Sequence, residues 1–273
     1  MRVRRIGSIG AAGALLGAAL AGVYAAGSAS ANVASDAGIV AAICPVVYPL
    51  DESAAERGVH YTFYGNSFFI DEHGYLATAA HVLSDFRDGG QPHILLRRMN
   101  APPRMMKVEV VATDLQHDIA ILRAVPNPFD GNYAVSFLRL GTEKPTPGTA
   151  VVAEALRPSR LKDPHTFDAP REERSAAGIL QYTATKLDNG QAAAELFLFD
   201  HQVERGQSGA PVIALETQEV LGIVEGQWLR GVAVRGIPNI GAAVPIVYAL
   251  PLLEKKKIPW HTAAPAPKVS PSL

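Results

Sequence analysis

The sequence predicts an all-β protein built from two lobes, with one helix near the C-terminus. Short apolar and β-branched runs recur between turn-forming residues from residue 59 onward, and no strand–helix–strand alternation interrupts them. Glycine and proline, at 24 and 20 of 273 residues, are frequent enough to supply the turns. An amphipathic helical pattern is found only around 245–256. These observations favour a β-sandwich or a pair of β-barrels over a parallel α/β fold.

The first 31 residues have the layout of a secretory signal. Three arginines among the first five residues precede an Ala- and Gly-rich apolar run over 6–26, and an A-x-A cleavage pattern occupies 29–31. The run is also long enough to span a bilayer, so an uncleaved membrane anchor is the alternative. Its glycine and serine content favours cleavage, which predicts a secreted or periplasmic protein without stable membrane insertion.

Charge and cysteine content argue against several classes of protein. The chain has 25 Lys and Arg against 26 Asp and Glu; residues 1–31 hold three of the arginines and no acid, which leaves 22 against 26, a net charge of −4. No basic stripe is present, which argues against a nucleic-acid partner. Cys44 is the only cysteine, so no internal disulfide is expected. Without a P-loop, a dinucleotide fingerprint, an H-E-x-x-H motif or a Cys/His cluster, no metal or other cofactor is expected.

Two sets of strand-like runs are separated by the turn-rich stretch PNPFDGN at 126–132. The first set comprises 59–65, 67–71, 75–80, 93–99, 106–114 and 118–125, and the second 136–141, 149–156, 177–187, 193–202, 210–215 and 219–226. The polar segment 157–174 is predicted to be an exposed loop. Residues 32–58 could be a pro-segment, a first strand or an ordered arm. The predicted organisation is therefore an N-terminal arm or pro-segment (32–58), a first lobe (59–131), a second lobe (132–256) and a Pro-rich tail (257–273).

The stretch ERGQSGAPVI, residues 204–213, contains a candidate nucleophile. Ser208 could equally be a polar residue in a tight turn before an apolar strand, because a serine hydroxyl is reactive only beside a base that a third group orients. His81 follows the apolar run in GYLATAAHVL, and Asp118 begins the run DIAIL. A neutral imidazole and a buried carboxylate suit those two roles. Either residue could instead be structural, as a surface histidine or an aspartate bonded to its own backbone.

Chain order separates two kinds of serine hydrolase. A G-x-S-x-G hydrolase requires the order Ser, acid, His. No aspartate follows Ser208, and the only later histidine is His261, in the Pro-rich tail. The order His81, Asp118, Ser208 is instead that of the chymotrypsin triad.

Several motifs in this order resemble the trypsin-like serine protease superfamily, and most closely its bacterial HtrA-type branch. The similar segments are GNSFFIDEHGYLATAAHVL, HDIAILRA, FLRLGTEKPTPGTAVVAEA, LFLFDHQVERGQSGAPVIALETQEVLGIVEG and IGAAVPIVYALPLLE, which together cover roughly residues 60–255. The resemblance implies two Greek-key β-barrels of the chymotrypsin type with a short C-terminal helix. It leaves no room for a PDZ module after residue 255.

The resemblance also implies a secreted serine endopeptidase that forms an acyl-enzyme from a protein or peptide substrate. His81 would be the general base and then the general acid, Asp118 would orient it, and Ser208 would attack the scissile carbonyl. The backbone N–H groups of Gly206 and Ser208 would form the oxyanion hole, for which glycine supplies the unusual dihedrals.

Specificity is carried over from the same resemblance. Gln202, six residues before the nucleophile, would form the floor of the primary pocket, and a neutral side chain there argues against a strong Lys or Arg preference. Val224, Glu225 and Gly226 would pair with the substrate backbone and line the pocket.

Two positions depart from the family pattern. Gln207 stands where relatives carry Asp or Asn, and Ala210 replaces the family's second glycine. These departures keep an alternative open, a catalytically inactive protease-like fold that serves as a protein-binding module. The sequence carries no signal of an oligomeric state.

Overall fold

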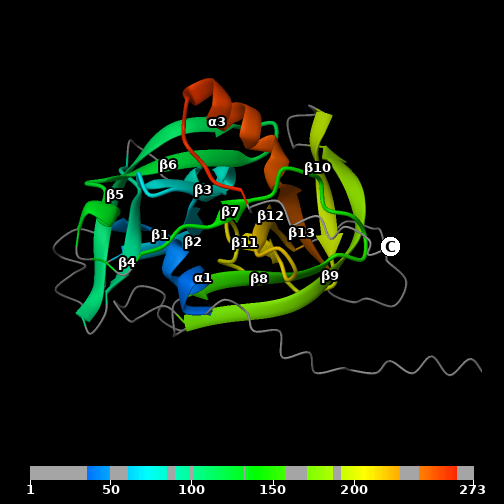
Figure 1. The fold of residues 1–273 in the computed structure, drawn as a ribbon, viewed down its shortest axis with the longest axis horizontal. Helices are drawn as coiled ribbons and strands as arrows, with labels where there is room; N and C mark the ends of the chain where they lie inside the picture. Colours follow the sequence, from blue (N-terminus) through cyan, green and yellow to red (C-terminus); the bar gives the residue numbers. More distant parts are fainter. Residues whose placement is uncertain are drawn as a thin grey trace, which may run out of the picture. The chain divides into compact units, whose positions relative to one another are not determined.

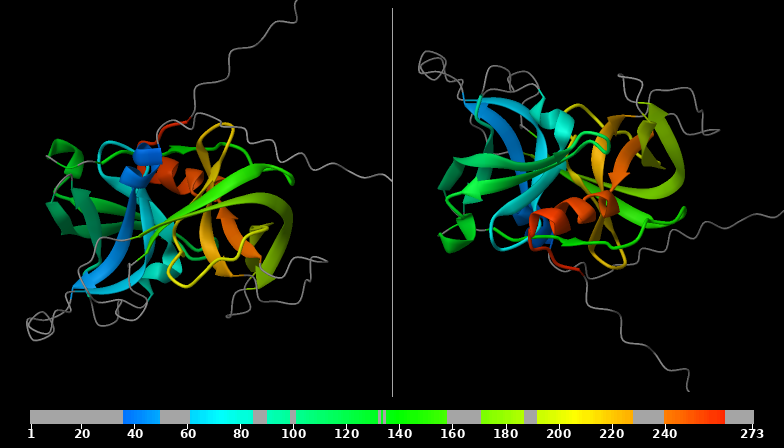
Figure 2. Two further views of the ribbon diagram at one scale, coloured as in Figure 1. Left: turned by 90° about the horizontal axis from the view of Figure 1, so that it is seen from below. Right: turned by 90° about the horizontal axis from the view of Figure 1, so that it is seen from above.

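The computed structural model describes residues 36–49, 61–84, 90–98, 101–131, 133, 135–157, 171–186, 192–227 and 240–262. They form two antiparallel β-barrels followed by a short helix, which confirms the predicted fold class (Figures 1 and 2). The signal expected at 1–31 lies outside the described residues. No helix among the described residues is long and apolar enough to cross a membrane.

The first barrel is a closed sheet of six strands in the order β1-β2-β3-β6-β5-β4. The strands are β1 (Ile43–Pro49), β2 (Tyr61–Phe69), β3 (Tyr75–Ala79), β4 (His93–Arg98), β5 (Ala101–Asp114) and β6 (Ile119–Val125). β1 pairs with β2 on one side and β4 on the other, and this double pairing closes the barrel.

The first barrel begins earlier than the sequence predicts. Helix α1 (Asp36–Ala42) leads directly into β1, whose first five residues are buried. Two prolines obscure this strand in the sequence, because proline cannot donate to a strand ladder. The expected boundary at residue 59 is therefore wrong: of the three possibilities for 32–58, the first strand applies to Ile43–Pro49. Cys44, within β1, is a buried free thiol, and burial raises its pKa.

The second barrel contains six strands in the order β11-β8-β9-β10-β13-β12, and a β11–β12 pairing closes it. β7 (Arg139–Leu140) adds to the outer side of β12 in parallel. The barrel strands are β8 (Ala150–Arg157), β9 (Arg171–Lys186), β10 (Ala192–Phe199), β11 (Pro211–Ala214), β12 (Glu219–Gln227) and β13 (Gly241–Pro245). The exposed loop expected at 157–174 is wrong at both ends, because Arg157 and residues 171–174 are strand residues; residues 158–170 lie outside the described part.

The C-terminal helix joins the two barrels. The 3₁₀ turn η4 (Ile246–Tyr248) follows β13 and leads into α3 (Leu250–Lys256). Leu253 is fully buried in an apolar cluster that also contains side chains of both barrels, and α3 contacts β5 of the first barrel. The predicted helix around 245–256 is thus confirmed, and its apolar face covers the first barrel (Figure 1).

The start of the predicted Pro-rich tail is packed against both barrels. Ile258 is 4% exposed, and the carbonyl of His261 accepts a hydrogen bond from the Leu140 N–H at 2.7 Å. The His261 ring stacks on Phe137 with centroids 4.7 Å apart. The tail boundary expected at 257 is therefore wrong, because Ile258 is buried and the His261 carbonyl is bonded to Leu140 of β7. Residues 263–273 lie outside the described part.

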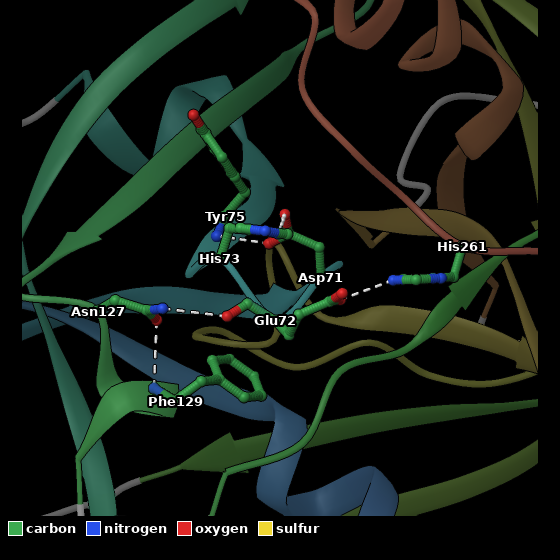
Figure 3. A network of polar contacts seen from close by, with 7 residues as sticks. All are labelled: Asp71, Glu72, His73, Tyr75, Asn127, Phe129 and His261. Carbon is green, nitrogen blue, oxygen red and sulfur yellow. Dashed lines mark hydrogen bonds and ion pairs between the residues drawn. The ribbon is translucent and has the colours of Figure 1, made fainter.

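Figure 3 shows how this segment reaches the β2–β3 turn of the first barrel. His261 Nε2 lies 2.7 Å from a carboxylate oxygen of Glu72. The Asn127 side chain donates to the Glu72 carbonyl at 3.1 Å and accepts from the Phe129 N–H. Asn127 thereby caps the short 3₁₀ helix η3 (Pro128–Asp130). The turn is thereby held to both the inter-barrel linker and the C-terminal segment.

Candidate active site

The β3–β6 ladder brings His81 and Asp118 together. Ala79 at the end of β3 pairs with Ile119 at the start of β6, so the residues just beyond each strand are neighbours. An Asp118 carboxylate oxygen lies 2.6 Å from His81 Nδ1, and the other accepts the His81 backbone N–H at 2.8 Å. The carboxylate therefore fixes both the ring and the backbone of His81.

Asp118 adopts a backbone conformation that few residues other than glycine tolerate. Its φ is 53°, in the left-handed region, where aspartate is one of the better accepted side chains. Its carbonyl accepts the Ala80 N–H at 2.9 Å, which adds to the two carboxylate contacts with His81. The Asp118 side chain is 18% exposed and that of His81 is 42% exposed, so the carboxylate is more buried than the imidazole that it contacts.

The loop that carries Ser208 joins β10 to β11 and is seated against the first barrel. A Cβ placed on Gly65 would lie 2.7 Å from the Ser208 carbonyl oxygen and 2.8 Å from the Val82 side chain. Val82 belongs to the 3₁₀ helix η1 (Ala80–Leu83), which also carries His81. The main chain of Ser208 therefore lies beside the turn that presents the His81–Asp118 pair.

Gly209 permits this close approach. Its φ is +81°, and a Cβ there would lie 2.1 Å from the Asn66 carbonyl oxygen and 2.5 Å from Thr78 Oγ1. Any larger residue would push the loop away from β2 and β3.

The Ser208 hydroxyl donates to the Glu225 carbonyl at 3.1 Å. That carbonyl can face the loop because the β12–β13 register shifts between Val224 and Gly226, which leaves Glu225 in a bulge. A bulge beside a candidate nucleophile matches the tendency of such irregularities to re-aim groups next to active sites.

The two predicted oxyanion donors, Gly206 and Ser208, lie on the same loop and are separated by one residue, Gln207. Gly206 has φ +94°, and a Cβ there would lie 2.6 Å from the Phe63 ring. The Gln207 carbonyl accepts the Ala210 N–H at 3.1 Å, so the trans peptide points the Ser208 N–H to the opposite side. Within the described residues neither the Gly206 nor the Ser208 N–H donates a hydrogen bond. Both N–H groups can therefore donate to one oxyanion as its negative charge develops.

Comparison with known proteins agrees with this geometry. The sequence profile of the family described as "Trypsin-like peptidase domain" matches residues 65–223, more than half of the chain. The chain belongs to the trypsin-like peptidase family. No curated protein matches it.

Solved structures with the same fold include two that are described as proteases, and Deg5. The Rv3671c protease from M. tuberculosis in its active form has 19% identity and a TM-score of 0.55, covering 84% of this chain and 85% of its own. The MamO protease domain from Magnetospirillum magneticum in its apo form has 15% identity and a TM-score of 0.56, with 79% and 97% coverage. Deg5 has 16% identity and a TM-score of 0.55, with 83% and 93% coverage. At these identities the likeness shows the chymotrypsin-like fold alone.

Both departures of this trypsin-like peptidase from the family pattern fit the structure. Gln207 is 6% exposed, and its side-chain oxygen accepts the Glu204 N–H at 2.8 Å, while its own N–H donates to the Glu204 carbonyl at 3.2 Å. The side chain thus closes the turn that precedes Ser208. Ala210 is completely buried, and its carbonyl accepts the Val224 N–H at 2.8 Å.

The specificity residues predicted for the peptidase fall into two groups. Gln202 is exposed and Glu225 is partly exposed, and a Cβ on Gly226 would meet nothing within 4 Å, so these three border open space. Val224 differs, because its side chain is 1% exposed and both its N–H and its carbonyl bond to the nucleophile loop at 2.8 Å. Val224 therefore supports the nucleophile loop, and its expected role in pairing with substrate stays a prediction.

Sequence reasoning missed an ion pair between a buried arginine and an exposed glutamate in the peptidase. The guanidinium of Arg157, at the end of β8, lies 2.5 Å from the Glu204 carboxylate, and the Arg157 side chain is only 6% exposed. The only sequence signal was an arginine at the end of an apolar strand, which had been assigned to the exposed loop. A charge-assisted contact of this kind ties the start of the nucleophile loop to β8.

Among the described residues, no group of three or more His, Cys, Asp or Glu side chains could hold a metal ion.

Proposed function

We propose that this trypsin-like peptidase is an exported serine endopeptidase that uses His81, Asp118 and Ser208 as its catalytic triad. The observation that carries the proposal is the 2.6 Å contact between His81 Nδ1 and Asp118. It supplies an oriented base beside the loop that holds Ser208, which is the arrangement that activates a serine.

The proposed reaction is acyl transfer. Because Asp118 accepts from Nδ1–H, the opposite ring nitrogen of His81 is left with the lone pair that a general base needs. Ser208 turns from the Glu225 carbonyl, transfers its proton to His81 and attacks the scissile carbonyl. The oxyanion accepts hydrogen bonds from the Gly206 and Ser208 N–H groups. His81 then protonates the leaving amine, and water releases the acyl group by the same steps.

Export and substrate class follow from other features. The signal-like pattern over 1–31 supports export to the cell exterior or the periplasm. Gly226, which follows the Glu225 bulge of β12, borders open space, and this suits an extended polypeptide lying along β12 and favours protein or peptide substrates. Export would be tested by the N-terminal mass of protein recovered outside the cytoplasm, which should begin near Asn32.

Covalent labelling tests the catalytic proposal. A fluorophosphonate should label the purified mature protein at one equivalent, and Ser208→Ala should abolish labelling. Ser136→Ala is the matched control, because the Ser136 hydroxyl donates to the Gly38 carbonyl away from the nucleophile loop. A folded wild-type protein that remains unlabelled would instead favour the inactive protein-binding module.

A further inference from the structure

Asn66 is a buried polar residue in the middle of β2. Its side chain is 0% exposed, although asparagine is depleted in strands and a buried amide is tolerated only with partners. The side-chain nitrogen donates to the Gly206 carbonyl at 2.8 Å, and the side-chain oxygen accepts the Leu156 N–H at 2.9 Å. The amide thus bridges the first barrel, the nucleophile loop and β8.

The backbone of the same residue holds a second point of the loop. The Asn66 N–H donates to the Ser208 carbonyl at 2.8 Å. One residue of the first barrel therefore binds the carbonyls of Gly206 and Ser208, the two residues whose N–H groups are the proposed oxyanion donors.

These bonds fix the peptide planes on each side of the Gln207–Ser208 peptide. The Gly206–Gln207 plane is held at its carbonyl by Asn66 and at its N–H by the Glu204 carbonyl, at 3.2 Å. The Ser208–Gly209 plane is held at its carbonyl by Asn66 and at its N–H by the Val224 carbonyl, at 2.8 Å. Each plane is therefore clamped at both ends.

Gly206 is the point at which such a clamp matters most. A glycine at φ +94° has no side chain to hold its conformation and can reach other backbone states at little cost. A hydrogen bond to its carbonyl from a fully buried amide restricts rotation about its Cα–C bond. The Gly206 N–H belongs to the preceding Arg205–Gly206 peptide, so holding the Gly206 carbonyl removes one of the two backbone rotations at Gly206 that could turn this N–H away. The narrower range of directions before any substrate is bound is the kind of preorganisation that oxyanion stabilisation requires.

We propose that Asn66 is a positioning residue that preorganises the oxyanion hole by holding the Gly206 carbonyl. The inference rests on the proposed function, because an oxyanion hole has a role only if Ser208 is acylated. Asn66 touches neither the substrate nor the reacting atoms in this scheme and acts through Gly206.

Two substitutions separate this role from simple packing. Asn66→Ala removes both side-chain bonds and leaves the Leu156 N–H without its acceptor, so some loss of stability accompanies it. Asn66→Asp keeps nearly the same shape and the acceptor for Leu156, but it turns a carboxylate oxygen toward the Gly206 carbonyl. Two acceptors then face each other, and the clamp becomes a repulsion at unchanged volume.

The test is the rate of phosphonylation of the mature protein by a fluorophosphonate, measured over a range of reagent concentrations. Losing a partner that positions a reactive group costs about 10- to 100-fold in comparable sites, less than losing an oxyanion donor. Both variants should lower the maximal rate by that factor without changing the half-saturating concentration. Ser67→Ala is the matched control: Ser67 is also fully buried in β2, but it donates to the Cys44 carbonyl at 3.1 Å and should stay within about twofold of wild type.

A pH series provides a readout that packing alone would not change. The carboxyl introduced by Asn66→Asp is buried, so its pKa is expected above the ordinary value. Once protonated, it can donate to the Gly206 carbonyl as the amide does. The rate of Asn66→Asp divided by that of wild type should therefore rise as the pH falls, and the ratio cancels the titration of His81.

Three outcomes are distinguishable. Slow variants with a pH-dependent ratio support the positioning role. Labelling of Asn66→Ala and Asn66→Asp within twofold of wild type overturns it and leaves the proposed function intact. A folded wild type that is not labelled overturns the proposed function and the role of Asn66 with it. If Asn66→Ala does not fold, Asn66→Asp still decides the question.

Discussion

Two histidine–aspartate pairs have the same contact distance and differ in sequence separation and surroundings. His81 Nδ1 lies 2.6 Å from the Asp118 carboxylate, and His117 Nδ1 lies 2.6 Å from the Asp114 carboxylate. His117 directly precedes Asp118 in the sequence, yet only one of the pairs lies beside the candidate nucleophile.

The second pair is local and partly buried, with the His117 side chain 23% exposed and that of Asp114 26% exposed. Asp114 lies three residues before His117, and its other oxygen accepts the N–H groups of Gln116 and His117 at 3.0 and 3.2 Å. The His117 ring stacks on Tyr248 with centroids 4.3 Å apart. The pair therefore shapes the β5–β6 turn and joins it to η4.

The first pair is formed across 37 residues by the β3–β6 ladder. Its histidine lies in η1, whose Val82 is close to the main chain of Ser208, and its aspartate contacts the histidine at both ring and backbone. The same contact distance therefore occurs in two different settings, and only the first pair belongs to the proposed triad.

The largest expected effect separates the two aspartates. Asp118→Asn should lower the phosphonylation rate by about 10⁴-fold, because an amide no longer selects the required tautomer of His81. Asp114→Asn is the matched control and should stay within about tenfold of wild type. Equal losses in the two variants would show that the distinction between the pairs is wrong.

A second substitution leaves both pairs intact and changes only the oxyanion side. Gly206→Ala would place a methyl group 2.6 Å from the Phe63 ring at a φ of +94°, so the loop must shift. We expect a loss of about 10²–10³-fold in the labelling rate. The measurement is the same phosphonylation assay, with the thermal midpoint as a check on folding. A wild-type rate would argue that the Gly206 N–H takes no part.

The His117–Asp114 pair should matter for stability rather than for reactivity. His117→Ala removes a ring stack and a hydrogen bond, and we expect it to destabilise the fold by about 1–2 kcal/mol in urea denaturation. Its labelling rate at a temperature where the protein is folded should change little. A large loss of labelling with unchanged stability would place this pair in the reactive site.

The smallest expected effect is a pH dependence of stability that arises from Glu195, which bonds to the hydroxyl of Tyr248. Lys144 and the Tyr248 hydroxyl bond to Glu195 and hold the pKa of its carboxyl below the ordinary value. A lowered folded-state pKa gives stability that is present above the unfolded pKa of about 4.3 and is lost as the pH falls through the folded one.

Wild type should therefore lose more stability between pH 7 and pH 3 than Glu195→Gln does. The Glu195 side chain is 39% exposed, so the difference should stay below about 1 kcal/mol. Urea denaturation at each pH measures it. Glu143→Gln, on the exposed neighbour of Lys144, should retain the wild-type pH dependence; identical curves for all three proteins would contradict the assignment.

Local patterns in the sequence predicted much of this arrangement. The alternation of strands and turns predicted an all-β fold, the resemblance to trypsin-like proteases implied the two barrels, and chain order singled out His81, Asp118 and Ser208 as partners. The strand Ile43–Pro49 escaped prediction because its prolines mask a continuous buried run. The lower boundary of the tail was misplaced because composition does not report that His261 packs on Phe137.

The role of Asn66 could not be predicted from local pattern at all. Its side chain meets Gly206, which lies 140 residues further along the chain, and that contact depends on how one barrel is seated on the other. The one available signal was a break between two predicted strands, 59–65 and 67–71. The structure has a single strand there, with Asn66 buried where the prediction placed the gap.

The most direct test of the account is to locate the adduct after the mature wild-type protein reacts with a fluorophosphonate. Mass spectrometry of the digested protein should find one equivalent, on the peptide that contains Ser208. The account predicts that Asp118→Asn slows the formation of this adduct without moving it. An adduct on another residue, or none in a folded protein, would contradict the claim that the His81–Asp118 pair activates Ser208.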